Sequence, residues 1–178
     1  MSLTIRTLDP ARVTDAERDA LTDVLARSFG TYTPHVLLYG ADADLDDLVM
    51  RICVDHALKR HVVVVAERGG AVVGVAMWLF ENLQPAYIKE AFGDATKQWW
   101  LLAQLGVSPS EKGTGVGSAL LKAKREETDT PLYLNTQTPA NVAFYEKNGY
   151  DVRADKAFDV PWSEEKWHDH FMSNPGDA

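Results

Sequence analysis

The sequence predicts an α/β fold in which a mixed sheet carries helices on both faces. Two observations support this class. Strand-like and helix-like segments follow one another in the order strand, helix, helix, hairpin, strand, helix, strand, helix, strand. A glycine-rich loop within 105–121 also joins an apolar strand directly to a helix, as in many α/β proteins.

Length and composition favour one globular domain over residues 1–178, with its core at about 3–172. The chain has 178 residues, of which 46% are hydrophobic, and this is enough for a sizeable core. Its net charge of −8 argues against sequence-independent binding to nucleic acid or to an anionic membrane, and it fits a cationic substrate. The single cysteine, Cys53, cannot form an internal disulfide, and the first residues lack an apolar signal-peptide core. We therefore expect a cytoplasmic protein.

The first part of the chain predicts one strand and two amphipathic helices. Alternating apolar and polar residues predict a strand over 3–8. A Thr-Asp-Ala-Glu capping box precedes apolar residues at helical spacing, which predicts a helix over 14–29 with Gly30 at its end. A second helix is expected from residue 45 to about residue 58. Between the two helices lies a loop or broken helix that is rich in aromatic residues.

The middle of the chain predicts three strands. The runs 61–67 and 71–80 are rich in β-branched residues, and Arg68-Gly69-Gly70 joins them as an antiparallel hairpin. The run 98–107 is almost continuously apolar, as expected for a strand that is covered on both faces.

The last part predicts two helices and three strands. After the glycine-rich loop, a helix with one apolar stripe is expected up to about residue 127, and then a strand over 131–136. Thr138-Pro139 favours the start of the second helix, and Gly149 favours its end. Strands are expected over 150–160, with an interruption at Asp155, and over about 166–172.

The glycine-rich loop is the strongest functional signal in the sequence. Gly113, Gly115 and Gly117 stand at every second position directly before a helix, so that several backbone N–H groups are free of neighbouring side chains. Such donors at a helix N-terminus bind anions, and a ligand with a diphosphate is the first hypothesis. A P-loop would need Lys-Ser/Thr after the last glycine, and a dinucleotide fingerprint would need one more residue before it. Neither pattern fits.

A second motif follows at Asn141-Val-Ala-Phe-Tyr-Glu-Lys-Asn-Gly-Tyr150, in which Asn141 and Tyr145 share one helix face. Together and in this order, the two motifs resemble those of the GNAT family of N-acetyltransferases. Lys112 stands where the family usually has Gln or Arg, whereas Gly115 and Gly117 match the family's glycine positions. The resemblance implies the GNAT fold, with a mostly antiparallel sheet of six or seven strands, and acetyl-CoA as the co-substrate.

The resemblance also implies roles for individual residues. The diphosphate would be bound by the backbone between Lys112 and Gly117, and Asn141 would contact the cofactor arm. The strand edge at Leu105 and Val107 would hydrogen-bond the pantetheine, with the Val107 N–H polarising the thioester carbonyl. The full set that the resemblance assigns to the cofactor is Leu105, Val107, Lys112, Gly113, Thr114, Gly115, Val116, Gly117, Asn141 and Tyr145. Tyr145 would protonate the leaving thiolate, because a thiol and a phenol have comparable pKa values of about 8.5 and 10.

Three runs, WWLLAQLGVSPSEKGTGVGSALL, PLYLNTQTPANVAFYEKNGYDV and GVAMWLF, are similar to the puromycin N-acetyltransferase branch of the family. That branch has a glutamate as general base in the strand that corresponds to PLYLNT, and this chain has Asn135 there. An amide cannot accept the proton, so that either water or another carboxylate would have to serve. Glu81 is the candidate from sequence.

The acceptor implied by this branch is a small-molecule primary amine, held by Tyr32, His35, Tyr39 and Asn135. We expect a monomer or homodimer. We also expect no metal: His168 and His170 would share one side of a strand, but no third ligand stands at a usual spacing. Each of three proposed site residues also has a structural alternative. Tyr145 could be a core aromatic residue, Asn141 a cap in the first turn of its helix, and Lys112 a solvated charge in the loop. Two other functions stay open, a non-catalytic acyl-CoA sensor and a protein N-acetyltransferase.

Overall fold

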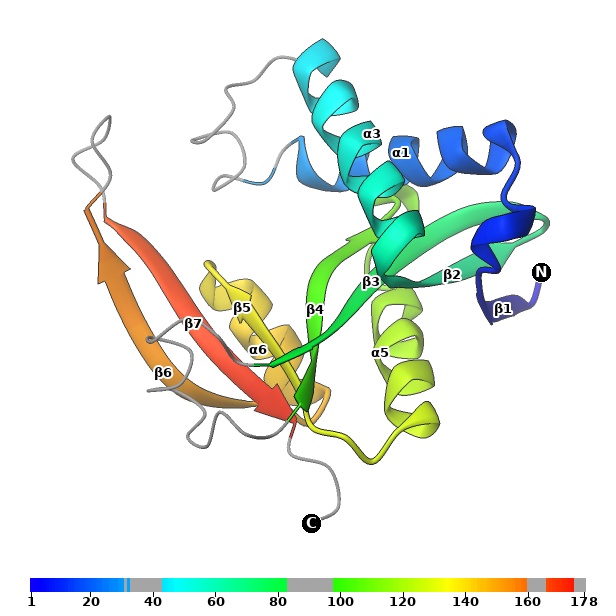
Figure 1. The fold of residues 1–178 in the computed structure, drawn as a ribbon. Coiled ribbons are helices and arrows are strands. Elements are labelled where there is room, and N and C mark those ends of the chain that lie inside the picture. The colour runs from blue at the N-terminus through cyan, green and yellow to red at the C-terminus, as the bar shows by residue number, and fades with distance from the viewer. Residues whose placement is uncertain (31, 33–42, 83–97, 160–165, 175–178) are drawn as a thin grey trace. The chain divides into compact units, whose positions relative to one another are not determined.

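The computed structural model describes residues 1–30, 32, 43–82, 98–159 and 166–174 (Figure 1). Within them, the strands are β1 (Leu3–Thr7), β2 (Val62–Arg68), β3 (Ala71–Asn82), β4 (Gln98–Val107), β5 (Leu132–Thr136), β6 (Asp151–Phe158) and β7 (Trp167–Asn174). The α-helices are α1 (Asp15–Phe29), α3 (Ala43–Arg60), α5 (Val116–Glu127) and α6 (Pro139–Lys147), with short 3-10 turns η1 (Pro10–Arg12) and η2 (Pro109–Glu111). No described helix has the length and apolar character needed to span a membrane.

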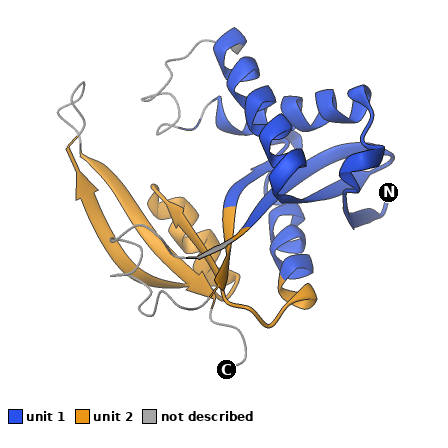
Figure 2. Ribbon diagram, viewed as in Figure 1, with its two compact units in different colours: residues 1–79, 103–124 blue, residues 80–102, 125–178 orange. Residues whose placement is uncertain are grey.

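The strands form one seven-stranded sheet in the order β1-β2-β3-β4-β5-β7-β6. The pairs β1–β2, β2–β3, β5–β7 and β6–β7 are antiparallel, and β4–β5 is parallel. The predicted α/β class and the mixed, mostly antiparallel sheet are therefore confirmed. The described chain divides into two compact units, residues 1–79 with 103–124 and residues 80–102 with 125–178 (Figure 2). The prediction of one domain over the whole chain stays a prediction.

In the first unit, helices cover both faces of the β2–β3 hairpin. Val63, Val65, Val75 and Met77 point to one face, where they form a core with buried residues of α1 and α3. Gly74 lies on the opposite face, because neighbouring residues of a strand alternate. A Cβ at Gly74 would stand 2.6 Å from Val116 Cγ1, so that the absence of a side chain lets α5 pack directly on β3.

A capping box has two hydrogen bonds between the cap residue and the residue three positions later, and the start of α1 forms one of them. The Thr14 hydroxyl accepts a hydrogen bond from the Glu17 N–H at 3.2 Å, as expected for an N-cap. The Glu17 carboxylate, however, bonds the guanidinium of Arg6 on β1 instead of returning to the cap. Tertiary pairing has thus replaced the local half of the motif.

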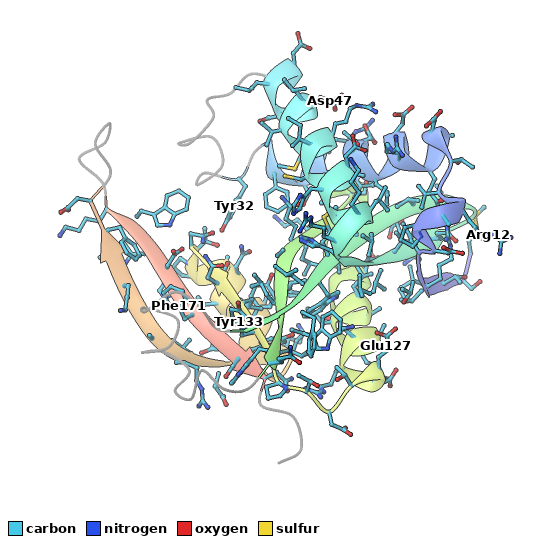
Figure 3. All side chains as sticks on the ribbon, in the orientation of Figure 1. Arg12, Tyr32, Asp47, Glu127, Tyr133 and Phe171 are labelled. Atoms are coloured by element: carbon cyan, nitrogen blue, oxygen red, sulfur yellow. The ribbon has the colours of Figure 1, made fainter. Side chains whose placement is uncertain are left out.

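In the second unit, β6 and β7 form a long antiparallel ladder next to β5. The predicted interruption of the strand at Asp155 is wrong: β6 runs unbroken over Asp151–Phe158, and its register shifts between Val152 and Ala154. A buried cluster of Trp99, Tyr133 and Phe171 joins β4, β5 and β7 (Figure 3). Helix α6 ends as predicted, with Gly149 in a left-handed conformation at φ +82°.

Candidate functional site

The glycine-rich loop of the first unit lies between β4 and α5. The chain leaves β4 through η2, and then adopts left-handed backbone conformations at Gly113 (φ +82°) and Gly115 (φ +88°). A Cβ at either position would have no heavy atom within 4 Å, so that glycine is needed here for its backbone conformation and not for space. The two turns bring the chain to the first residue of α5.

Backbone N–H groups without acceptors gather at this turn. The Ala119 N–H donates to the Gly115 carbonyl at 3.0 Å, which makes Gly115 the N-cap residue directly before α5. In the described part of the chain, five N–H groups around this point have no acceptor, and they belong to Gly113, Gly115, Val116, Gly117 and Ser118. The first turn of α5 has no acidic residue that would compete for them. These donors and the positive end of the helix dipole suit a phosphate or diphosphate.

Glu111 holds the other side of the loop in place. Its backbone carbonyl accepts from the Thr114 hydroxyl at 2.8 Å, and its carboxylate accepts from the same hydroxyl at 2.9 Å. The carboxylate also lies 3.3 Å from Nε of Arg68, at the end of β2. The Thr114 side chain is therefore turned toward Glu111, while the Lys112 side chain is exposed to solvent beside the free N–H groups.

Val107, at the end of β4, has a partner that the sequence did not predict. The Ser108 N–H donates to the Val73 carbonyl on β3 at 2.9 Å, so that the Val107 N–H points to the opposite edge of β4. There it donates to the hydroxyl oxygen of Ser28 on α1 at 3.3 Å. Ser28 lies on the same face of α1 as the buried residues Leu21 and Leu25. A polar residue on this apolar face was the one feature of the sequence that could have indicated the contact with Val107.

In the second unit, α6 carries both residues of the downstream motif. Thr138 caps the helix, since its hydroxyl accepts from the Asn141 N–H at 3.3 Å. One turn later Tyr145 is 9% exposed, and its ring makes edge contacts with Phe144 and Tyr150 at centroid distances of 5.0 and 5.8 Å. Tyr145 therefore lies among aromatic rings on the buried side of α6.

Tyr150 is a second phenol beside Tyr145, with a different environment. Burial raises the pKa of Tyr150 far above its ordinary value, the nearby Tyr145 raises it further, and Arg125 opposes the shift. The Tyr150 hydroxyl is buried and has no hydrogen-bond partner among the described residues. It therefore stays protonated over the whole physiological range.

Asn135, on β5, belongs to a polar group on one face of the second unit. Its side-chain N–H donates to Oδ1 of Asp169 on β7 at 3.3 Å. The side chains of Gln137 and Trp167 donate to the same oxygen at 2.6 and 3.0 Å. Sequence reasoning placed Asn135 in the site and missed Asp169, which lies 34 positions away along the chain.

The remaining predicted residues are placed only in part. Tyr32 is half-buried, and its ring packs edge-on against Phe29 at a centroid distance of 5.9 Å. His35 and Tyr39 lie outside the described residues, and so does the side chain of Glu81, near the end of β3. The residues Leu105 to Gly117 thus lie in the first unit, and Asn135, Asn141 and Tyr145 in the second.

His168 and His170 do share one side of β7, as predicted, and their rings stack at a centroid distance of 6.4 Å. Both Nδ1 atoms approach Oδ1 of Asp155 on β6, at 3.5 and 3.7 Å. Among the described residues, no set of three or more His, Cys, Asp or Glu side chains is arranged to hold a metal ion.

Comparison with known proteins identifies the family of this chain and shows which solved structures share its fold. Residues 59–152 match the family described as acetyltransferase (GNAT) domain, and this stretch contains both motifs. The chain is similar to a Corynebacterium glutamicum structure described as histone acetyltransferase HPA2 and related acetyltransferase, with 23% identity, a TM-score of 0.70, and coverage of 100% of this chain and 98% of that one.

Two other solved structures show the same fold. An aminoglycoside 6'-acetyltransferase type Ii is 19% identical with a TM-score of 0.63, over 96% of this chain and 95% of that one. The putative acetyltransferase yncA from Salmonella typhimurium, solved with its cofactor acetyl-CoA, is 18% identical with a TM-score of 0.60, over 100% of this chain and 96% of that one. These similarities define the fold, and the family match covers the loop and α6.

Proposed function

This chain belongs to the acetyltransferase (GNAT) family, and we propose that it transfers the acetyl group of acetyl-CoA to a primary amine of a small molecule. Transfer would be direct, with both substrates bound in a ternary complex. One observation carries the donor half of this proposal: five backbone N–H groups without acceptors at the start of α5, inside the segment that matches the family. The description of yncA with acetyl-CoA bound to the same fold supports the choice of anion.

The proposed donor site uses the chain's own groups in two ways. The N–H groups of Gly113, Gly115 and Gly117 would bind the diphosphate, with Thr114 and Val116 in the same loop and the Lys112 cation beside it. The edge of β4 at Leu105 and Val107 would bind the pantetheine arm, together with Asn141. Holding the thioester in this way turns the reaction into an effectively unimolecular step.

Tyr145 is the proposed proton donor to the leaving thiolate. Tyr145 is 9% exposed, and in the proposed reaction its phenol would give this proton directly to the sulfur. Glu81 stays the sequence-based candidate for the base that takes the acceptor's proton.

The choice of a small-molecule acceptor has fewer observations behind it than the choice of acetyl-CoA as the donor. It derives from the sequence runs that are similar to the puromycin-type branch and from the aromatic residues between α1 and α3, of which Tyr32 is described. The related structures include a protein named as an aminoglycoside acetyltransferase and one named as a histone acetyltransferase, so that the fold alone does not choose between acceptor classes.

The direct test measures free thiol released from acetyl-CoA in the presence of a panel of primary amines, with the reaction without amine as the control. The proposal predicts amine-dependent thiol release and an acetylated product of the expected mass. Release that occurs only with lysine-containing peptides or proteins would contradict the small-molecule acceptor. Tight binding of acetyl-CoA without turnover on any amine or peptide would favour a non-catalytic sensor, which Asn135 in place of the expected glutamate keeps as the second candidate.

A further inference from the structure

The polar group on β5 and β7 contains a carboxylate whose role the proposed reaction does not yet use. Oδ1 of Asp169 accepts three hydrogen bonds, from Asn135, Gln137 and Trp167. Within the described part of the chain, the second carboxylate oxygen, Oδ2, has no hydrogen-bond partner. One oxygen is thus fixed by three donors, and the other is left for a ligand.

The three donors fix the orientation of this carboxylate. Asn135 lies on β5 and Gln137 directly follows that strand, while Trp167 and Asp169 share one side of β7. The register pairs Asn135 with Phe171, which places the carboxylate diagonally across the ladder from the amide. Donors from two strands hold one oxygen, so the plane of the carboxyl group is set before any ligand arrives.

Aromatic rings and a lysine of the neighbouring strand lie around Asp169, so that an acceptor's ammonium group would have to bind beside them. By strand alternation, its face also carries Tyr133 and Phe171, which with Trp99 form the buried aromatic cluster of this unit (Figure 3). Lys156 on β6 lies directly opposite Asp169 in the register and is half-buried. His168 and His170, its neighbours along β7, alternate to the other face beside Asp155.

We infer that Asp169, in place of Glu81, binds the acceptor's ammonium group and accepts its proton. This inference rests on the proposed function. Asn135 stands where the resemblance expected a general base, and its amide donates to Asp169. The carboxylate that is missing from β5 is therefore supplied by the neighbouring strand β7, and Asn135 acts as a positioning residue for it.

The proton balance of the reaction has a place for this group. An ammonium acceptor carries three N–H protons and the amide product carries one, so two protons must leave the nitrogen. Asp169 takes the first and passes it to solvent, which frees the lone pair for attack on the thioester carbonyl. When the C–S bond breaks, Tyr145 protonates the thiolate, and the second nitrogen proton restores the phenol. One proton is released to solvent in each turnover.

The test uses Asp169→Asn in the full chain. The amide oxygen of the variant still accepts from Gln137 and Trp167, so that the fold is kept, and only the free oxygen changes its chemistry. For an alkylamine, kcat/KM for the acceptor should fall by on the order of 100-fold, while KM for acetyl-CoA should not change. For an amine that is unprotonated at neutral pH, such as a hydrazide or an arylamine, the loss should be much smaller, since no proton must be removed before attack.

A matched control comes from the opposite face of the β6–β7 ladder. Asp155→Asn removes a carboxylate of β6 that contacts His168 and His170, and the acceptor kinetics should stay as in the wild type. Asp169→Glu should regain part of the lost activity, because it restores a carboxylate to this face. Equal kcat/KM for the alkylamine in wild type and Asp169→Asn would overturn the inference, and so would an equal loss for both amine types. An inactive wild-type protein would instead contradict the proposed function.

Discussion

The backbone N–H of Val107 donates to the Ser28 hydroxyl oxygen at 3.3 Å, across the edge of β4 that β3 does not use. Gly106 explains why α1 comes so close, since a Cβ there would lie 2.8 Å from Leu25 Cδ2 and 3.3 Å from Ser28 Cβ. The N–H group that we propose as the polariser of the thioester carbonyl is therefore occupied by a side chain that can rotate away. In the proposed reaction, a substrate oxygen would replace the Ser28 hydroxyl as the acceptor of this N–H group.

The first prediction concerns this serine. Ser28→Ala removes the competing acceptor and leaves the Val107 N–H free, so that kcat should equal or exceed that of the wild type. Steady-state thiol release at saturating amine measures it. A loss of about 100-fold or more, of the size seen when an oxyanion donor is removed, would mean that the hydroxyl itself takes part in the chemistry.

The second prediction concerns the backbone of the glycine-rich loop between β4 and α5. Gly115→Ala places a side chain at φ +88° and should cost about 1 kcal/mol of stability, because the left-handed region is unfavourable for alanine. It should also weaken acetyl-CoA binding, since the N–H groups shift away from the diphosphate. Calorimetric titration and thermal unfolding measure the two effects.

Gly70 provides the matched control for that loop variant. It lies in the β2–β3 turn at φ +82°, and a Cβ there would have no heavy atom within 4 Å, as at Gly115. Gly70→Ala should therefore lose similar stability but keep its affinity for acetyl-CoA. Equal affinity loss in both variants would show that general strain, and not the position of the N–H groups, controls binding.

The third prediction separates the two neighbouring phenols. Tyr145→Phe removes the proposed proton donor, and kcat should fall by roughly 100-fold while the Kd of acetyl-CoA changes little. Tyr150→Phe removes a buried hydroxyl that has no partner among the described residues, so turnover should persist and stability should stay equal or rise. Thiol release and thermal unfolding of both variants decide the assignment. An unchanged kcat in Tyr145→Phe would remove this residue from the mechanism and leave it as a packing residue of α6.

The fourth prediction concerns pH and the attachment of β1. A hydrogen bond from Arg6 lowers the pKa of Glu67 below its ordinary value of 4.5. The pair therefore stabilises the folded state above that value, and the contribution is lost as the pH falls through the lowered pKa. Because the pair is partly exposed, its contribution is about 1 kcal/mol or less. Glu67→Gln should unfold at a lower temperature than the wild type at neutral pH. The difference should disappear in strong acid, and a difference that stays constant with pH would contradict the pairing.

Local patterns explain why most of the fold could be predicted. The hairpin at Gly69-Gly70, the N-caps at Thr14 and Thr138 and the stop at Gly149 each depend on neighbouring residues alone. The glycine-rich loop was predictable for the same reason, since glycine spacing and a following helix are features of one short segment. The sequence also indicated its chemistry, an anion at a helix N-terminus.

Contacts between distant segments could not be predicted. The Ser28 hydroxyl meets Val107 79 positions later, and Asn135 meets Asp169 34 positions later. The strand pairing that creates the Asp169 contact depends on the order β5-β7-β6, which no local pattern specifies. For this reason the sequence located Asn135 but proposed Glu81 as the base. Similarly, Glu17 matched a capping box, and only the packing of β1 showed that Arg6 takes its carboxylate.

The most direct test of the central claim is an amide NMR titration of the protein with acetyl-CoA, compared with S-acetylpantetheine, which has the same thioester but lacks the diphosphate. We predict that acetyl-CoA shifts the resonances of Gly113, Gly115, Val116, Gly117 and Ser118, and that acetylpantetheine binds much more weakly and leaves these five unchanged. Equal affinity for the two compounds, or acetyl-CoA shifts that avoid the start of α5, would contradict the claim that this loop binds the diphosphate.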